Sequence, residues 1–200
     1  MTAARVAVLI SGTGSNMLAL LDAMADPGFP AIPALVLSNR PDAAGLARAA
    51  TRGVATAHVD HRGRDRAAFE AEIDDRLRAV GADLICLAGF MRVLTPDFVA
   101  RWAGRILNIH PSLLPVFPGL DTHARALAAG VALHGATVHR VTADLDAGPI
   151  LAQAAVPVLP NDTVDMLAER VLAAEHRLYP QTLRHLLSGA PLPLAQFPRP

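Results

Sequence analysis

Residues 5–16 read RVAVLISGTGSN, and this stretch indicates the class of fold. The segment Arg5–Ile10 is short and almost wholly apolar, as expected for a strand that is buried on both faces of a sheet. Ser11–Asn16 is a tight turn that contains two glycines, and Met17–Ala25 has the apolar spacing of a helix. A strand, a tight turn and a helix in this order begin the repeating unit of α/β proteins.

The same alternation continues along the chain. Further strands are expected at Ala34–Ser38, Val54–Val59, Asp83–Ala88, Arg105–Ile109, Ala136–Val141 and Ile150–Val158. Further helices are expected at Ala43–Thr51, Asp65–Val80, Pro96–Trp102, Thr122–Ala129 and Thr163–Tyr179. Pro180 is expected to kink or end the last helix. The pattern predicts a doubly wound, mainly parallel α/β sheet with an antiparallel C-terminal strand, and ligands beyond the carboxyl ends of its strands.

Length and composition restrict the class of protein. The 200 residues predict a single domain over 1–190, followed by an extended proline-rich tail over 191–200. Eighteen basic and 18 acidic residues give a formal net charge of zero, so no basic surface for nucleic acid or for a membrane is expected. All the basic residues are arginine, which excludes a Walker lysine and a Schiff-base lysine. No signal peptide or membrane-spanning stretch is recognised, and a single cysteine allows no internal disulfide, so a cytoplasmic protein is expected.

The turn after the first strand is the first candidate site. Met17 stands where a dinucleotide fingerprint has its third glycine, so neither that fingerprint nor a P-loop is present. What remains is Gly12 and Gly14 before a helix N-terminus, whose free N–H groups and dipole favour an anion, with Ser15 and Asn16 as further donors. A capped turn that binds nothing explains these residues equally well.

Two further segments carry groups that are suited to proton transfer. Asn108 and His110 stand two apart at the end of a strand, so their side chains point to the same side. An amide donor beside an imidazole can stabilise an oxyanion and handle a proton. Asp144 and Asp146 lie in the turn DLDAGP, where one carboxylate could orient and charge the imidazole. The spacing does not choose between the two acids, and both segments can also be ordinary polar loops.

Other catalytic classes find no support in the sequence. No pair among the eight histidines has the H-x-x-x-H or H-E-x-x-H spacing of a metal site, so no metal is expected. The G-x-S-x-G pattern of serine hydrolases is absent. Cys86 lies within an apolar strand, so it is expected to be a core residue, and the pattern alone predicts packing roles for Phe90 and Met91 as well.

Four segments occur in order at fitting separations: SGTGSN at 11–16, LAGFMRVL at 87–94, NIHPSLLP at 108–115 and HGATVHRVTADLDAGPI at 134–150. In these segments, and in Glu175-His176, the chain resembles the phosphoribosylglycinamide formyltransferases, a family of folate-dependent enzymes. The resemblance extends from about Arg5 to about Leu187. The chain departs from many relatives in having Val116 after LLP in place of a basic residue, and it contains no lysine. These departures leave its contacts to a substrate phosphate or to a polyglutamate tail open.

The resemblance implies the formyltransferase fold and a one-carbon transfer in purine biosynthesis. In this family a formyl group passes from 10-formyltetrahydrofolate to the amine of glycinamide ribonucleotide. By resemblance, the catalytic residues are Asn108 and His110, which donate to the developing oxyanion, and Asp146, which pairs with His110. The ribonucleotide is expected to bind Gly12, Thr13, Gly14, Ser15, Asn16 and Glu175. The folate is expected to bind Met91, Arg92, Val93, Leu94, Asn108 and Asp144.

Several features stay open at this point. The acceptor could be another amine, such as a sugar nucleotide, or the chain could be a non-catalytic binder of nucleoside monophosphates. The expected partners are small molecules, with no nucleic acid and no membrane, and the chain could be a monomer or a homodimer. Arg62, Arg64 and Arg66 either bind a polyglutamate tail or form a solvated face. The resemblance also implies a cis peptide bond between Leu114 and Pro115.

Overall fold

The computed structural model describes residues 3–192 and 194–197. The chain divides into two compact units, Met1–Asn108 and Ile109–Pro200. None of the described helices has both the length and the apolar character needed to cross a membrane.

Parallel strands form the sheet of the first unit, in the order β3–β2–β1–β4–β5. The strands are β1 Ala4–Ile10, β2 Ala31–Ser38, β3 Thr56–His58, β4 Leu84–Leu87 and β5 Ile106–His110. The helices are α1 Ser15–Met24, α2 Ala44–Ala50, α3 Arg66–Ala79 and α4 Pro96–Arg101. After β3 the chain returns past β1 to form β4, so the direction of winding reverses between β1 and β4. In sheets of this kind ligands bind in the crevice at that reversal.

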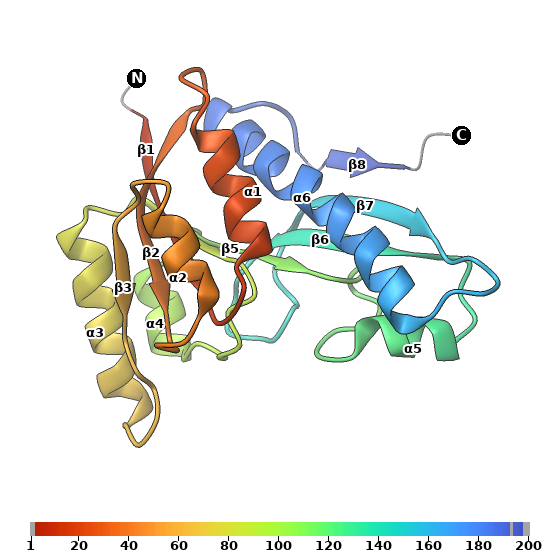
Figure 1. The fold of residues 1–200 in the computed structure, drawn as a ribbon, viewed down its shortest axis with the longest axis horizontal. Coiled ribbons are helices and arrows are strands. Elements are labelled where there is room, and N and C mark those ends of the chain that lie inside the picture. The colour runs from red at the N-terminus through yellow and green to blue at the C-terminus, as the bar shows by residue number, and fades with distance from the viewer. Residues whose placement is uncertain (1–2, 193, 198–200) are drawn as a thin grey trace. The chain divides into compact units, whose positions relative to one another are not determined.

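The central strand and the first helix explain the core of this unit. Residues 6–10 of β1 are fully buried, as expected for a strand that is covered on both faces. Helix α1 buries a stripe with helical spacing, formed by Met17, Leu20, Leu21 and Met24. Figure 1 shows α1 and α2 side by side, and the two helices are in contact.

The second unit pairs β6 (Leu133–Arg140) antiparallel with β7 (Ile150–Pro157), and β7 parallel with β8 (Leu194–Gln196). Its helices are α5 (Thr122–Ala128) and α6 (Val164–Ser188). Helix α6 packs on β6 and β7 through an apolar stripe of Leu167, Val171, Ala174 and Leu178. The parallel pairs of the first unit and the antiparallel β6–β7 pair confirm the predicted α/β class.

The sequence analysis expected Pro180 to kink or end the last helix. Pro180 does not end it, because α6 continues through this residue to Ser188. A proline inside a helix removes one backbone hydrogen bond and costs about 3 kcal/mol. Here Pro180 is buried, and Tyr179 and Leu183 beside it are fully buried. The apolar surface that the extra turns remove from water offsets the lost hydrogen bond.

Other boundaries differ by a few residues. Helix α1 begins at Ser15 rather than Met17, and β5 extends to His110 rather than ending at Ile109. In the predicted tail, Leu194–Gln196 forms β8, whereas Pro193 and residues 198–200 lie outside the described residues. The single domain over 1–190 stays a prediction.

Candidate active site

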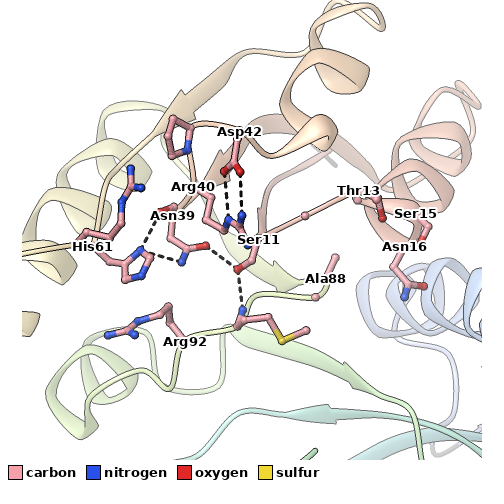
Figure 2. A pocket seen from close by; sticks show the side chains of 16 residues that line it. Ser11, Thr13, Ser15, Asn16, Asn39, Arg40, Asp42, His61, Ala88 and Arg92 are labelled. Carbon is pink, nitrogen blue, oxygen red and sulfur yellow. Dashed lines mark hydrogen bonds and ion pairs between the residues drawn. The ribbon is translucent and has the colours of Figure 1, made fainter. Parts of the chain in front are cut away.

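A pocket of about 590 Å³ lies at the carboxyl ends of the strands of the first unit (Figure 2). It brings together all five residues predicted at the glycine turn, Gly12, Thr13, Gly14, Ser15 and Asn16, with Met91 and Arg92 of the predicted folate segment. The remaining lining residues are Ser11, Asn39, Arg40, Pro41, Asp42, His61, Arg62, Ala88 and Gly89. The pocket occupies the winding reversal beside β1 and β4, where the fold class places ligands.

A chain of polar side chains, which the sequence interpretation missed, crosses this pocket. The Ser11 hydroxyl donates to the Asn39 side-chain oxygen at 2.6 Å, and the Asn39 amide lies 3.2 Å from Nδ1 of His61. Figure 2 shows Ser11 at the middle of the chain of contacts, with the start of α1 on the side opposite Asn39 and His61. Ser11 follows β1, Asn39 follows β2 and His61 follows β3. Polar residues placed just after successive parallel strands were the signal that could have identified them.

The glycine turn has the geometry of an anion site. Gly14 precedes α1 with φ of 70°, in the left-handed region that favours glycine, and no side chain caps the helix. The first N–H groups of any helix lack partners within the helix and carry the positive end of its dipole. The Thr13 and Gly14 N–H groups also donate to no protein acceptor in the part of the chain that the structure describes. An anion bound here would therefore meet several free donors.

The predicted folate segment is attached to the same turn through Ser11. The Met91 N–H donates to the Ser11 hydroxyl at 2.8 Å, and the Ser11 N–H donates to the Gly89 carbonyl at 3.1 Å. Met91 is 68% exposed and Val93 is exposed, so the packing role that the pattern alone predicted for Met91 is wrong. Leu94 is buried, and the predicted burial of Cys86 and Phe90 is confirmed. Because Ser11 holds the strand end, the segment presents Met91 to solvent instead of to the core.

The second unit contains a buried histidine–carboxylate pair. Nδ1 of His110 lies 3.4 Å from Oδ2 of Asp146, and both side chains are at most 7% exposed. The same Asp146 oxygen accepts a hydrogen bond from the Gly119 N–H at 2.9 Å, and its other oxygen lies 3.8 Å from Nε2 of His139. The carboxylate thus sits between two imidazoles.

The other ring nitrogen of His110 also faces an acceptor. Nε2 of His110 lies 3.0 Å from the Phe117 carbonyl. A charged imidazole donates from both nitrogens, so it can satisfy the carbonyl and the carboxylate together. Asp146 has φ of 52°, which is uncommon for a residue other than glycine, and strained backbone of this kind clusters at functional sites.

The remaining predicted site residues have different surroundings. Asp144 is exposed, so it is Asp146 and not Asp144 that lies beside His110. Asn108 is partly buried on β5, two residues before His110, and it does not line the pocket of the first unit. Glu175 is buried on α6. The predicted cis bond between Leu114 and Pro115 is confirmed.

The three arginines that follow β3 have different surroundings. Arg62 lines the pocket and pairs with Asp60 at 2.8 Å. Arg64 instead pairs with Glu72 at 2.7 Å, and Arg66 is the first residue of α3. A polyglutamate-binding role for these residues stays a prediction.

Two further histidines of the second unit lie together, His134 buried and His123 half-buried, and neither forms an ion pair with a described residue. The rings of His123 and His134 meet edge to face, with centroids 5.3 Å apart. Among the described residues, Nδ1 of His123 and Nε2 of His134 have no hydrogen-bond partner. Burial lowers the pKa of His134 to about 4, and the neighbouring His123 adds to this shift. No group of three metal-binding side chains occurs among the described residues.

The His134 shift predicts a loss of stability in acid. The unfolded chain binds a proton on this residue with a pKa near 6.5, and the folded protein only near pH 4. The stability that neutral His134 contributes is therefore complete above pH 6.5 and is lost as the pH falls towards 4. We expect a loss of about 2 kcal/mol from this residue between pH 7.5 and pH 5.

Urea unfolding at both pH values measures this loss. His134→Phe keeps a ring in place but cannot titrate, so its stability should fall less than that of the wild type. His58→Gln, at an exposed position on β3, serves as the control and should behave as the wild type. Equal losses in the wild type and His134→Phe would exclude His134 as the titrating group.

Comparisons with known proteins bear on the family. Residues 4–183 match the family model described as formyl transferase. The chain is 44% identical to phosphoribosylglycinamide formyltransferase of Escherichia coli K12 over 185 residues, which cover 92% of this chain and 87% of that protein. A crystal structure of phosphoribosylglycinamide formyltransferase from Brucella melitensis superposes with a TM-score of 0.90, at 53% identity, covering 96% of this chain and 99% of that one.

Longer proteins also contain this segment. The chain is 50% identical to the trifunctional purine biosynthetic protein adenosine-3 of Bos taurus over 188 residues, which cover 94% of this chain but only 19% of that protein. The chain thus spans about a fifth of the length of this relative. The family match extends over most of the chain and includes the turn at 12–16, the 91–94 segment, β5 and Asp146. The chain belongs to the formyl transferase family and, within it, to the phosphoribosylglycinamide formyltransferases.

Proposed function

We propose that the protein transfers a formyl group from 10-formyltetrahydrofolate to the amine of glycinamide ribonucleotide, a step of purine biosynthesis. The observation that carries the proposal is the buried His110–Asp146 pair, whose histidine ends the strand that also carries Asn108. The chain's membership of the formyl transferase family supplies the class of reaction and implies a formyl-folate co-substrate. That the acceptor is glycinamide ribonucleotide, and that the donor is 10-formyltetrahydrofolate, are both part of the proposal.

The chemical step needs a stabilised oxyanion and a proton carrier. The substrate amine attacks the formyl carbon, and the carbonyl electron pair moves to oxygen to form a tetrahedral intermediate. Asn108 and His110 donate hydrogen bonds to this oxygen, because both side chains leave one side of β5. His110 does so from Nε2, which exchanges its contact with the Phe117 carbonyl for the substrate oxygen while Nδ1 keeps facing Asp146. Collapse of the intermediate re-forms the C=O bond and breaks the bond to the folate nitrogen. His110 and Asp146 carry the proton from the attacking amine towards that leaving nitrogen.

We assign the binding roles that the family resemblance implies for these residues. The ribose phosphate binds at the free N–H groups of the turn, with Ser15 and Asn16 as further donors. Glu175 holds the glycine amine or the ribose. The folate lies along Met91–Leu94, with further contacts from Asn108 and Asp144.

The direct test offers the formyl donor to several acceptors. Purified protein is incubated with 10-formyltetrahydrofolate and either glycinamide ribonucleotide or an amino-sugar nucleotide, and the products are identified by mass spectrometry. Formylation of glycinamide ribonucleotide alone supports the proposal, whereas formylation of the sugar nucleotide alone supports a related enzyme. Phosphate binding without any transfer would identify a non-catalytic nucleotide binder.

Gly12→Ala tests the phosphate site with little disturbance of the fold. A Cβ at this position would have no neighbour within 4 Å, so the methyl group enters open space at the pocket wall. If the phosphate approaches the backbone there, KM for the ribonucleotide should rise by about tenfold, while KM for the folate changes little. Gly28→Ala, where a Cβ makes only ordinary contacts, is the matched control in the same unit. If Gly12→Ala and Gly28→Ala had similar KM values for the ribonucleotide, the phosphate would not bind at this turn.

A further inference from the structure

Helix α2 holds two consecutive carbonyl groups of the glycine turn. The Gly45 N–H donates to the Gly12 carbonyl at 3.0 Å. A guanidinium nitrogen of Arg48 donates to the Thr13 carbonyl at 3.2 Å. Both donors belong to α2, so one helix fixes the orientation of two successive peptide groups in the turn.

The orientation of these peptide groups decides where the turn can bind an anion. In a trans peptide the C=O and the following N–H point in opposite directions. With the Gly12 and Thr13 carbonyls directed towards α2, the Thr13 and Gly14 N–H groups are directed away from it. Neither of these two N–H groups has a protein acceptor among the described residues, and Thr13 and Gly14 both line the pocket. Successive backbone N–H groups aimed the same way form a cradle for an anion.

Close packing and charge strengthen this arrangement. A Cβ at Gly45 would lie 2.4 Å from Cδ1 of Ile10 and 3.1 Å from the Gly12 oxygen, so the α2 backbone is in direct contact with the turn. Arg48 forms no ion pair with any described residue, so its positive charge is not neutralised there. In a chain without lysine, this is a cation placed directly beside the proposed phosphate site.

We propose that Arg48 is a positioning residue for the phosphate of the substrate. It holds the Thr13 peptide so that the Thr13 and Gly14 N–H groups face the anion, and its charge favours the phosphate dianion. Gly45 permits the close approach of α2 that this contact requires. The inference rests on the proposed binding of a ribose phosphate at the turn.

A pair of arginine variants tests this role. Arg48→Met removes the guanidinium but keeps an unbranched side chain, and Arg52→Met makes the same change four residues later. Arg52 pairs with Asp22 at 2.9 Å and donates to the Arg48 carbonyl at 3.4 Å, and no hydrogen bond or ion pair joins it to the described residues of the turn. Binding of ribose 5-phosphate is measured by calorimetry, and KM is measured for both substrates.

The expected pattern separates positioning from general support of the fold. Arg48→Met should raise the Kd for ribose 5-phosphate and KM for the ribonucleotide by about tenfold, with KM for the folate within about twofold of wild type. Arg52→Met should bind as the wild type does, and Arg48→Lys should recover part of the affinity because it restores the charge. Glycinamide riboside, which lacks the phosphate, should react equally with the wild type and Arg48→Met.

Four outcomes would overturn the inference. Equal weakening by Arg48→Met and Arg52→Met, or equal rises in KM for both substrates, would mean a general structural role. Unchanged ribose 5-phosphate affinity in Arg48→Met, with normal binding by the wild type, would refute the positioning role while leaving the proposed function intact. Failure of the wild type itself to bind ribose 5-phosphate would refute the proposed phosphate site and the inference with it.

Discussion

His110→Ala should lower kcat by about 10³-fold while the affinity for ribose 5-phosphate stays near that of the wild type. The imidazole combines two tasks in the proposed step, because it donates to the oxyanion and carries the proton of the attacking amine. Each task acts mainly on the transition state, so its loss appears in kcat rather than in KM. Steady-state kinetics with both substrates, together with calorimetric binding of ribose 5-phosphate, measures the two quantities.

A matched histidine variant makes this result specific. His58→Ala changes an exposed histidine on β3 and should leave kcat within about twofold of wild type. Thermal unfolding checks that His110→Ala remains folded, since its side chain is buried and its removal leaves a cavity. A folded His110→Ala protein with near-normal kcat would exclude the histidine from the chemical step.

The fold was predictable because its signals are local and repeated. The fully apolar run of β1 identified a strand buried on both faces, and the predicted antiparallel C-terminal strand agrees with the antiparallel pair that β6 and β7 form. The course of α6 past Pro180 was not predictable from local rules. It depends on burial of Tyr179 and Leu183, which the sequence alone does not reveal. Strand β8 was missed because three residues within a proline-rich tail pair with β7 only through tertiary structure.

The residues that lie in recognised motifs were predictable from the sequence, whereas the residues that meet only in the folded chain were not. The glycine turn and the 91–94 segment were recognised as motifs, and the structure brings the turn together with Met91 and Arg92 of that segment in one pocket. The chain from Ser11 to Asn39 and His61 was missed, since its members are 28 and 22 residues apart in sequence and only Ser11 belongs to a recognised motif. The left-handed backbone at Asp146 was equally hidden, because only its three-dimensional setting holds a non-glycine residue there.

Asp146→Asn should lower kcat by about 10²-fold with little change in either KM. Asparagine keeps the shape of the side chain and an oxygen that can accept from the Gly119 N–H. It also tolerates the left-handed backbone at this position, where φ is 52°. The substitution therefore removes chiefly the negative charge that faces Nδ1 of His110 at 3.4 Å. Without that charge, nothing facing Nδ1 stabilises the positive charge that His110 gains with the proton of the attacking amine.

Two comparisons decide whether Asp146 acts through His110. Asp144→Asn removes the exposed carboxylate two residues earlier and should be far milder than Asp146→Asn. The double variant His110→Ala, Asp146→Asn should be little worse than His110→Ala alone, because residues that act as one unit do not contribute independently. If the two losses in kcat multiplied, Asp146 would act by a route that does not involve His110. If Asp144→Asn were the more damaging change, the exposed carboxylate would be the functional acid.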